Sequence, residues 1–284
     1  MATTLKWLPR DLEEHYTPLN SGLPNYSKDE ITYELNSDDY RSDEFDKKTE
    51  LPILFMGCSL TEGIGLPLNE VWTYHLHSKI AETTGKVIPF WSLAKGGTGI
   101  DYAARCFYKY GPLLKPKYVF YLLSSTHRRE YEYCLDTAEY RMWLPSDTPD
   151  NSFSMFADPK FSAYQAYRSL MILNSVASST GTTIFIFNPF PETSPKGIFE
   201  QFSNIEYIPK FVQSALPLPA QPSYGLPDRL KSRPWLARDN MHPGARWQYQ
   251  IYNIMWNYVK DKFSCQQDNI NKDDCTQSSL PLYP

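Results

Sequence analysis

Short apolar runs alternate with stretches of helical period from Leu51 to about residue 262. Four of the runs are continuously apolar or aromatic, which indicates strands buried on both faces, as in a parallel sheet covered by helices. These runs are LPILFMG (51–57), KVIPFWSL (86–93), KYVFYLL (117–123) and TTIFIFN (182–188). Helices are expected near 69–83, 98–110, 158–180, 196–215 and 244–262. The pattern predicts an α/β fold, a three-layer αβα sandwich around a central parallel sheet.

The two ends of the chain fall outside this alternation. Residues 1–50 are polar and turn-rich, and we expect them to form an arm over the domain of residues 51–262. A short apolar stretch, Ile31–Leu35, predicts one strand within this arm. Residues 263–284 are expected to form a polar tail.

Composition and charge narrow the class of protein. Of the 284 residues, 42% are hydrophobic and 21% are charged, which is typical of a soluble globular protein and excludes wholesale disorder. The net charge is −4, and the scattered Lys and Arg residues give no reason to expect a nucleic-acid partner. No apolar run reaches the ~18–20 residues of a membrane-spanning helix, and the first residues lack the apolar core of an export signal. We therefore expect a cytoplasmic protein without a membrane span; composition does not indicate its oligomeric state.

The cysteines and histidines do not form a recognisable ligand set. The five cysteines are an odd number with no Cys-x-x-Cys pair, so neither a disulfide framework nor a zinc site is expected. His75 and His77 stand two apart on a predicted helix and do not share a face. The sequence therefore predicts neither a metal nor a cofactor.

A turn of small residues follows the first predicted strand, and it contains Ser59. In open α/β sheets ligands gather at the carboxyl ends of the strands, where a serine on a tight strand-to-helix turn presents its hydroxyl. Gly57 removes a side chain that would crowd this turn. Cys58 is expected to point back into the fold, where a thiol is inert. On its own, the serine is better explained as a helix cap.

A second polar turn, Arg238-Asp239-Asn240-Met241-His242-Pro243-Gly244, precedes the last predicted helix. A serine hydroxyl is a poor nucleophile at neutral pH and needs a base, and that base needs a partner to fix its tautomer. Asp239 and His242 stand three residues apart in one turn and supply both. Ser59, Asp239 and His242 are therefore the candidate catalytic residues.

These two turns resemble the first and last blocks of the SGNH or GDSL hydrolase superfamily. GCSLTEGIGL is similar to its Gly-Asp-Ser element, which is often Gly-Cys-Ser in bacterial and phage members, and DNMHPG is similar to its Asp-x-x-His element. The segment ITYELNSDDYRSDEF resembles the phage-type arm N-x-x-G-x-R-x-x-E-F, with Asp39 in place of the glycine. The resemblance implies a flavodoxin-like fold in which Ser59 is the nucleophile, His242 the general base and then acid, and Asp239 the residue that orients His242.

The resemblance also implies an oxyanion hole built from Ser59, Gly97 and Thr126. The second block fits Ser92-Leu93-Ala94-Lys95-Gly96-Gly97, with Ser92 in place of the usual Asn and the Gly97 N–H as donor. Thr126 stands where the family has the Asn of its third block, and a hydroxyl donates a hydrogen bond but reaches less far. Losing one such donor typically costs about 2.7–4 kcal/mol of transition-state stabilisation. Arg128 is an alternative source of positive charge.

Two stretches without a period are expected to be long loops that line a pocket. They cover residues 135–157 and 216–237, and loops of this length in a compact domain are usually functional. Trp143, Tyr224 and Trp235 lie in them and are candidate walls, with packing in an aromatic core as the alternative. Arg128 is a further candidate for substrate binding, through a carboxylate or a sugar hydroxyl.

We therefore expect a serine esterase of the SGNH type that cleaves a short acyl group from a carbohydrate or lipid without a cofactor. A catalytically weak carbohydrate-binding or virion-associated module is the alternative, because the third-block Asn is absent and aromatic residues make up 15% of the chain. An acyltransferase would use the same three catalytic residues and would differ only in the acceptor. The substrate is expected to be a small-molecule or glycan ester.

Overall fold

The central sheet has five parallel strands in the order β4-β3-β5-β8-β9. The computed structural model describes residues 2–9, 11–16, 26–124, 128–134, 139–143, 158–189, 197–208 and 227–264. The strands are β4 (Trp91–Ser92), β3 (Ile53–Met56), β5 (Tyr118–Leu122), β8 (Thr183–Phe187) and β9 (Ile205–Ile208). All four predicted strands are present. The shortest, β4, begins only after Phe90, whose N–H and carbonyl bond to Asp43 of the arm at 2.9 and 2.8 Å.

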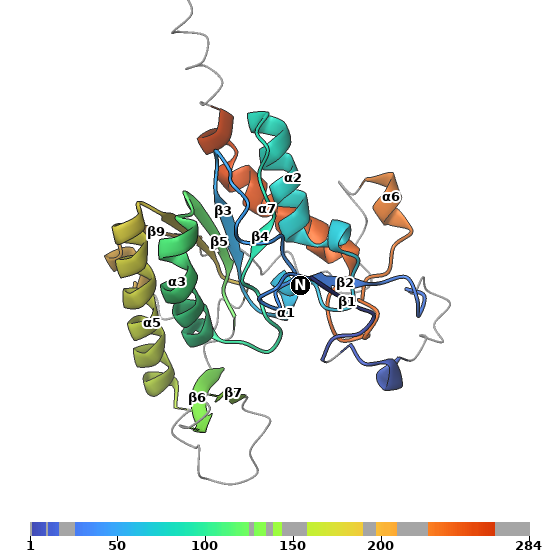
Figure 1. Cartoon of the computed structure of the whole chain (residues 1–284), viewed down its shortest axis with the longest axis horizontal. Helices are drawn as coiled ribbons and strands as arrows, with labels where there is room; N and C mark the ends of the chain where they lie inside the picture. Colours follow the sequence, from blue (N-terminus) through green and yellow to red (C-terminus); the bar gives the residue numbers. More distant parts are fainter. Residues whose placement is uncertain are drawn as a thin grey trace, which may run out of the picture.

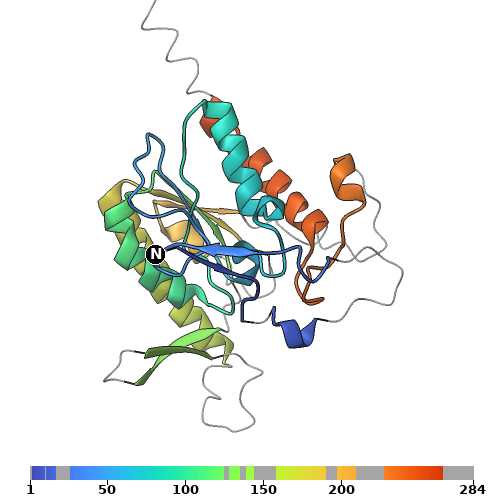
Figure 2. The same cartoon turned by 45° about the vertical axis from the view of Figure 1, so that its right-hand side comes forward.

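Helices cover both faces of the sheet (Figure 1). They are α2 (Trp72–Thr84), α3 (Ile100–Leu114), α5 (Pro159–Thr180) and α7 (Ala245–Val259). The paired helices α3 and α5 lie on one side, and α2 and α7 lie on the other (Figure 2). Alternate residues of each strand face the two layers: Phe55 packs with the α2 and α7 core and Leu54 with the α3 and α5 core. The αβα sandwich predicted from the continuous apolar runs is confirmed.

One predicted helix is wrong. The helix expected near 196–215 is instead a 3-10 turn, η5 (Phe199–Gln201), followed by strand β9. Phe199, Phe202 and Ile205 recur every three residues like one face of a helix, but they are buried from a turn and a strand. The ring of Phe199 stacks on Tyr207 of β9 with centroids 3.9 Å apart. This packing, together with pairing to β8, outweighs the local pattern.

The loop predicted at 135–157 is also partly wrong. Residues Glu139–Trp143 form β7, which pairs antiparallel with β6 (Arg129–Cys134) beyond the end of α5 (Figure 1). Both segments alternate charged and aromatic or apolar residues with the period of two that suits a strand. In the second predicted loop, residues 227–237 contain a short helix, α6 (Asp228–Lys231). Residues 216–226 lie outside the described part of the chain.

Two short strands of the arm pair with each other, and described residues of the arm pack on the core beneath α2 and α7. Strands β1 (Thr3–Leu5) and β2 (Tyr33–Leu35) form a two-stranded antiparallel sheet, and η1 (Glu13–His15) lies between them in the sequence. The strand expected at Ile31–Leu35 is therefore present as β2. Tyr26 and Tyr33 are almost completely buried in the α2 and α7 core.

Candidate active site

Ser59 lies at the carboxyl end of β3, as the first residue of a four-residue helix, α1 (Ser59–Glu62). The chain makes this sharp turn through Gly57, whose φ is +154°. A Cβ on Gly57 would lie 2.0 Å from Thr61 Oγ1, so no other residue fits there. Cys58 and Ser59 are both buried, at 3% and 5% exposed, and Cys58 is a free cysteine.

Asp239 and His242 form a compact acid–base pair. The Asp239 carboxylate accepts hydrogen bonds from the His242 Nδ1–H and, at 3.1 and 3.0 Å, from the backbone N–H groups of Met241 and His242. A carboxylate can only accept, so Nδ1 carries the proton and Nε2 is the basic nitrogen of the neutral ring. Burial alone would raise the pKa of Asp239, but its bonds and attraction to His242 together with the two backbone N–H groups lower the pKa below its usual 3.8.

Gly65 joins the serine turn to the Asp–His turn. The backbone N–H of Arg238 donates to the Gly65 carbonyl at 2.9 Å. A Cβ on Gly65 would lie 2.9 Å from the Cβ of Ala237 and 3.3 Å from the Asp239 nitrogen, so the two turns are in close contact. Within the described residues, Ser59 and His242 share no hydrogen bond, and the ring nitrogen Nδ1 of His242 bonds to Asp239.

The predicted oxyanion loop lies against the same strand end. Lys95 donates its N–H to the Gly57 carbonyl at 3.3 Å, and the Thr98 hydroxyl donates to the Lys95 carbonyl at 2.7 Å. Gly97 has a φ of +81°, which only glycine adopts without strain. Within the described ranges, the backbone N–H groups of Ser59 and Gly97 have no acceptor. These two N–H groups, one of Ser59 itself and one of the neighbouring loop, could therefore donate to a bound ligand.

Glu62 is a site residue that the sequence analysis missed. Its side chain is 4% exposed, and its carboxylate accepts a hydrogen bond from the Gly96 N–H at 2.6 Å. The Ser-x-x-Glu spacing of Ser59 and Glu62 is the pattern of a helix capping box, in which the carboxylate would turn back to its own helix. The structure instead directs it across to the neighbouring loop, and no local sequence signal predicts that.

Arg41 holds the serine turn from the arm, a role that the motif alone did not reveal. Its guanidinium is buried and donates to the carbonyls of Glu62 at 3.1 Å, Gly63 at 2.9 Å and Leu66 at 2.8 Å. It also lies 4.6 Å from the centre of the Tyr33 ring. Burial lowers the pKa of this guanidinium to about 10.

Asp39 departs from the glycine of the arm motif but keeps the backbone of a glycine. Its φ is +63°, in the left-handed region that Asp tolerates better than most residues. Its carbonyl accepts a hydrogen bond from Lys95 Nζ at 2.7 Å. The replacement therefore leaves the turn intact and connects the arm to the oxyanion loop.

The remaining predicted residues fall partly within the described chain. Half-buried Arg128 lies beside the oxyanion loop, where its Nη1 approaches the Thr98 carbonyl at 3.5 Å. Trp235 stacks with the Arg246 guanidinium, 4.8 Å from its ring centre, and its carbonyl accepts from the Gly244 N–H at 2.6 Å. Trp143 belongs to β7, but its side chain lies outside the described part, as do Thr126 and Tyr224 entirely.

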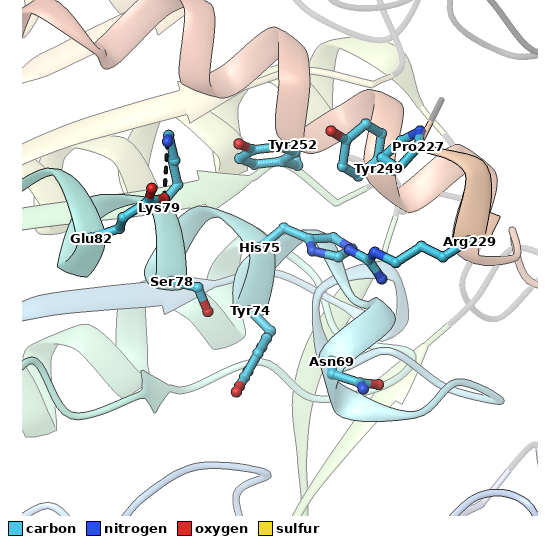
Figure 3. Close-up of a pocket in the computed structure, with 10 residues that line it drawn as sticks. All are labelled: Asn69, Tyr74, His75, Ser78, Lys79, Glu82, Pro227, Arg229, Tyr249 and Tyr252. Atoms are coloured by element: carbon cyan, nitrogen blue, oxygen red, sulfur yellow. Dashed lines mark hydrogen bonds and ion pairs between the residues drawn. The ribbon is translucent and has the colours of Figure 1, made fainter. Parts of the chain in front are cut away.

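A separate hollow of about 410 Å³ lies between α2, α6 and α7 (Figure 3). His75, Arg229, Tyr249 and Tyr252 are among its lining residues, and none of the predicted site residues reaches it. In the described chain no group of three or more His, Cys, Asp or Glu side chains is arranged to hold a metal ion. Nor does any described helix have the length and apolar character needed to cross a membrane.

Comparison with known proteins gives matches by structure alone. No protein-family model matches the chain, and no curated protein does. The structure of TesA covers 74% of this chain and 98% of its own, with 14% identity and a TM-score of 0.48. Esterase EstA from Pseudoalteromonas sp. covers 74% of this chain and 96% of its own, with 16% identity and a TM-score of 0.45.

A two-domain esterase active on acetylated mannans covers 82% of this chain and 53% of its own, with 16% identity and a TM-score of 0.42. GDSL-like lipases are among the further matches. Likeness at this level does not establish an activity for this chain. The phage-type detail of the resemblance stays a prediction.

Proposed function

We propose that this chain is a serine esterase of the SGNH hydrolase superfamily that cleaves a short acyl group, such as acetate, from a carbohydrate or lipid. The observation that carries the proposal is the meeting of two turns at Gly65. One turn begins with Ser59 at the carboxyl end of a central strand, and the other holds the hydrogen-bonded Asp239–His242 pair. This is the set of groups that activates a serine hydroxyl.

In the proposed reaction Ser59 Oγ attacks the ester carbonyl and its proton passes to Nε2 of His242. Asp239 holds the imidazole in the correct tautomer and stabilises the imidazolium. The N–H groups of Ser59 and Gly97 donate to the oxyanion, with Thr126 as the third donor. His242 then protonates the departing alcohol, which leaves an acyl group on Ser59. Water, deprotonated by His242, attacks that acyl group and releases the acid and the free serine.

Arg128, Trp143 and Trp235 are proposed to contact the substrate. The location of Arg128 beside the Thr98 carbonyl supports this for the side nearest the oxyanion loop. Trp235 precedes the Asp–His turn and its ring already stacks on a cation, which supports a role as a flat wall for a sugar or acyl group. Alanine at these positions should raise KM with little change in kcat.

The test is hydrolysis of p-nitrophenyl esters from acetate to palmitate by the wild type, Ser59→Ala and Asp239→Asn. We expect turnover of short chains, a fall of about 10³-fold or more in both variants, and a fluorophosphonate adduct on Ser59 in the folded wild type. Ser78→Ala, which changes an exposed serine of α2, is the matched control and should keep full activity. Absence of both turnover and adduct would overturn the proposal in favour of a binding module, for which a glycan-binding screen is the next measurement.

The same assay separates hydrolysis from acyl transfer. Adding methyl glucoside as an alcohol acceptor should leave the free acid as the main product if water resolves the acyl-enzyme. A product that is mainly acylated glucoside would identify a transferase that uses the same three residues.

A further inference from the structure

The four-residue helix that begins with Ser59 ends with a side chain that holds the neighbouring loop. Glu62 is almost fully buried, and its Oε2 accepts the Gly96 N–H at 2.6 Å. Gly96 immediately precedes Gly97, whose N–H is the proposed oxyanion donor. One carboxylate thus connects the element carrying the nucleophile to the loop carrying the second donor.

The charged groups around Glu62 are engaged elsewhere. Lys95 gives its ammonium to the Asp39 carbonyl, Arg41 gives its guanidinium to backbone carbonyls, and His242 bonds to Asp239. Within the described ranges, Gly96 makes the single hydrogen bond that the carboxylate accepts. A buried carboxyl group without a partner is costly, so this bond is needed at both of its ends.

The electrostatic surroundings act in both directions on this group. Burial raises the pKa of the Glu62 carboxyl, whereas the charge of Lys95, the Gly96 N–H, the charge of Arg41 and the charge that His242 carries when protonated oppose that rise. The bond from Gly96 persists in either case, because an oxygen of a neutral carboxyl group also accepts. The position of the loop therefore depends on an acceptor oxygen more than on a full negative charge.

The hydrogen bonds on either side of the Glu62–Gly96 contact lie at the ends of the loop, and Gly96 also lies close to the Ile64 side chain. Lys95 bonds to Gly57 on one side and the Thr98 hydroxyl closes back on Lys95 on the other. Between them Gly96 and Gly97 have no side chain to pack, so the Glu62 carboxylate supplies the contact in the middle. Displacing a donor by about 1 Å can cost about 100-fold in rate.

We propose that Glu62 is a positioning residue that sets the spacing between the Ser59 and Gly97 N–H groups. This role rests on the proposed esterase function. Because the contact holds the residue next to an oxyanion donor and does not involve the proposed substrate-binding residues, its loss should lower the rate of the chemical step and leave ground-state binding unchanged.

The test compares Glu62→Ala with Glu62→Gln, which keeps an acceptor oxygen, and with Glu62→Asp, which is one methylene shorter. We expect kcat on p-nitrophenyl acetate to fall about 10- to 100-fold in Glu62→Ala with KM within about threefold, and Glu62→Gln to stay within about fivefold of the wild type. Glu62→Asp should resemble the alanine variant, and it carries the test if Glu62→Ala does not fold. Unchanged kcat in a folded Ala or Asp variant would overturn the proposal.

Glu70→Ala is the matched control. Glu70 is also a buried acid with a 2.6 Å hydrogen bond, from the Tyr26 hydroxyl, and it also pairs with Arg233. This variant should lose stability but keep kcat within about threefold. An equal fall in kcat for Glu70→Ala and Glu62→Ala would mean that general destabilisation explains the loss and would overturn the positioning role.

A measurement that needs no turnover separates this inference from the proposed function. The Gly96 amide proton should resonate downfield in the wild type and in Glu62→Gln, and should move upfield in Glu62→Ala. A Gly96 resonance that does not respond to the alanine variant would overturn the contact itself. A Gly96 shift that responds to Glu62→Ala as expected would confirm the contact. If the wild-type protein then neither hydrolyses esters nor labels at Ser59, the esterase function is overturned, and the catalytic role of Glu62 with it.

Discussion

Arg238 and Asp11 form a fully buried ion pair across 227 residues of sequence, with Nη2 and Oδ2 2.6 Å apart. Arg238 immediately precedes Asp239. Asp11 also accepts the Tyr33 hydroxyl, whose oxygen in turn accepts the Gly65 N–H at 2.7 Å. One arm carboxylate therefore supports both turns of the candidate site.

Asp11→Ala should be strongly destabilising. The change leaves the Arg238 cation buried without its partner, and breaking a buried pair in this way typically costs about 3–5 kcal/mol. Urea denaturation would measure the loss, and kcat on p-nitrophenyl acetate should fall with it. The control is Asp29→Ala, which breaks the exposed pair with Lys6 and should cost no more than about 1 kcal/mol. Equal losses in the two variants would contradict this prediction.

Gly65→Ala should lower activity, whereas Gly85→Ala should not. Both glycines have a left-handed φ, +73° and +65°, so alanine carries a backbone cost of roughly 1–2 kcal/mol at either position. The added Cβ meets nothing within 4 Å at Gly85, but at Gly65 it pushes on Ala237 and Arg238. We expect kcat to fall at least tenfold in Gly65→Ala alone. Measuring kcat and urea stability for both variants distinguishes displacement of the Asp–His turn from backbone strain. Equal kcat values in Gly65→Ala and Gly85→Ala would exclude displacement.

Arg41→Ala should destabilise the protein and lower the reactivity of Ser59. The change removes this donor from the carbonyls of Glu62, Gly63 and Leu66. The Gly63 carbonyl keeps the Leu66 N–H, and each buried carbonyl left unpaired costs about 1–3 kcal/mol. The serine turn then loses its support from the arm, so the rate of fluorophosphonate labelling at Ser59 should fall. Arg41→Lys should recover only part of both losses, because one ammonium does not reproduce the fork geometry. Full recovery by lysine would show that only the charge matters.

His75 should make stability fall with acidification. Burial, and to a smaller extent the charge of Arg229, lower the pKa of His75 from 6.5 to about 4 (Figure 3). Between these two values the unfolded chain binds a proton that the folded chain does not. The free energy of unfolding should therefore drop as pH falls through this window, with a limiting slope of about 1.4 kcal/mol per pH unit.

His75→Phe removes this proton and keeps a ring beside Tyr249 and Tyr252. Urea denaturation from pH 8 to 4.5 should show a shallower decline for the variant, with parallel behaviour above about pH 7.5. If the free energy of unfolding has the same dependence on pH in the variant and the wild type, His75 has the same pKa in the folded and the unfolded chain, which contradicts the prediction.

Four strands of the central sheet could be predicted from sequence, and the candidate catalytic residues could be singled out, because both depend on local signals. The run around Phe55 is continuously apolar, and Ser59 and His242 belong to short turns whose residue types already point to nucleophilic catalysis. Strand β9 could not be predicted, because Phe199 and Phe202 carry a helical spacing that is overridden by two non-local contacts, the stacking of Phe199 on Tyr207 and the pairing of β9 with β8.

The supporting residues were missed for a different reason. Arg41, Glu62 and Asp11 act through bonds to backbone groups or side chains far away in the sequence, and nothing beside them in the chain signals these partners. Asp39 looked like a departure from the arm motif, yet its left-handed backbone keeps the turn that the glycine would make.

The Asp11–Arg238 pair also bears on the order of events during synthesis. A ribosome makes Asp11 and Ser59 early, whereas Arg238 emerges only after some four-fifths of the 284 residues have been joined. Until then the acid that supports Gly65 lacks its cation, and contacts of such long sequence separation close late in folding. A nascent chain would therefore contain Ser59 well before Asp11 can pair with Arg238, so the support that the arm gives to Gly65 would be complete only once the segment carrying the Asp–His turn has been made.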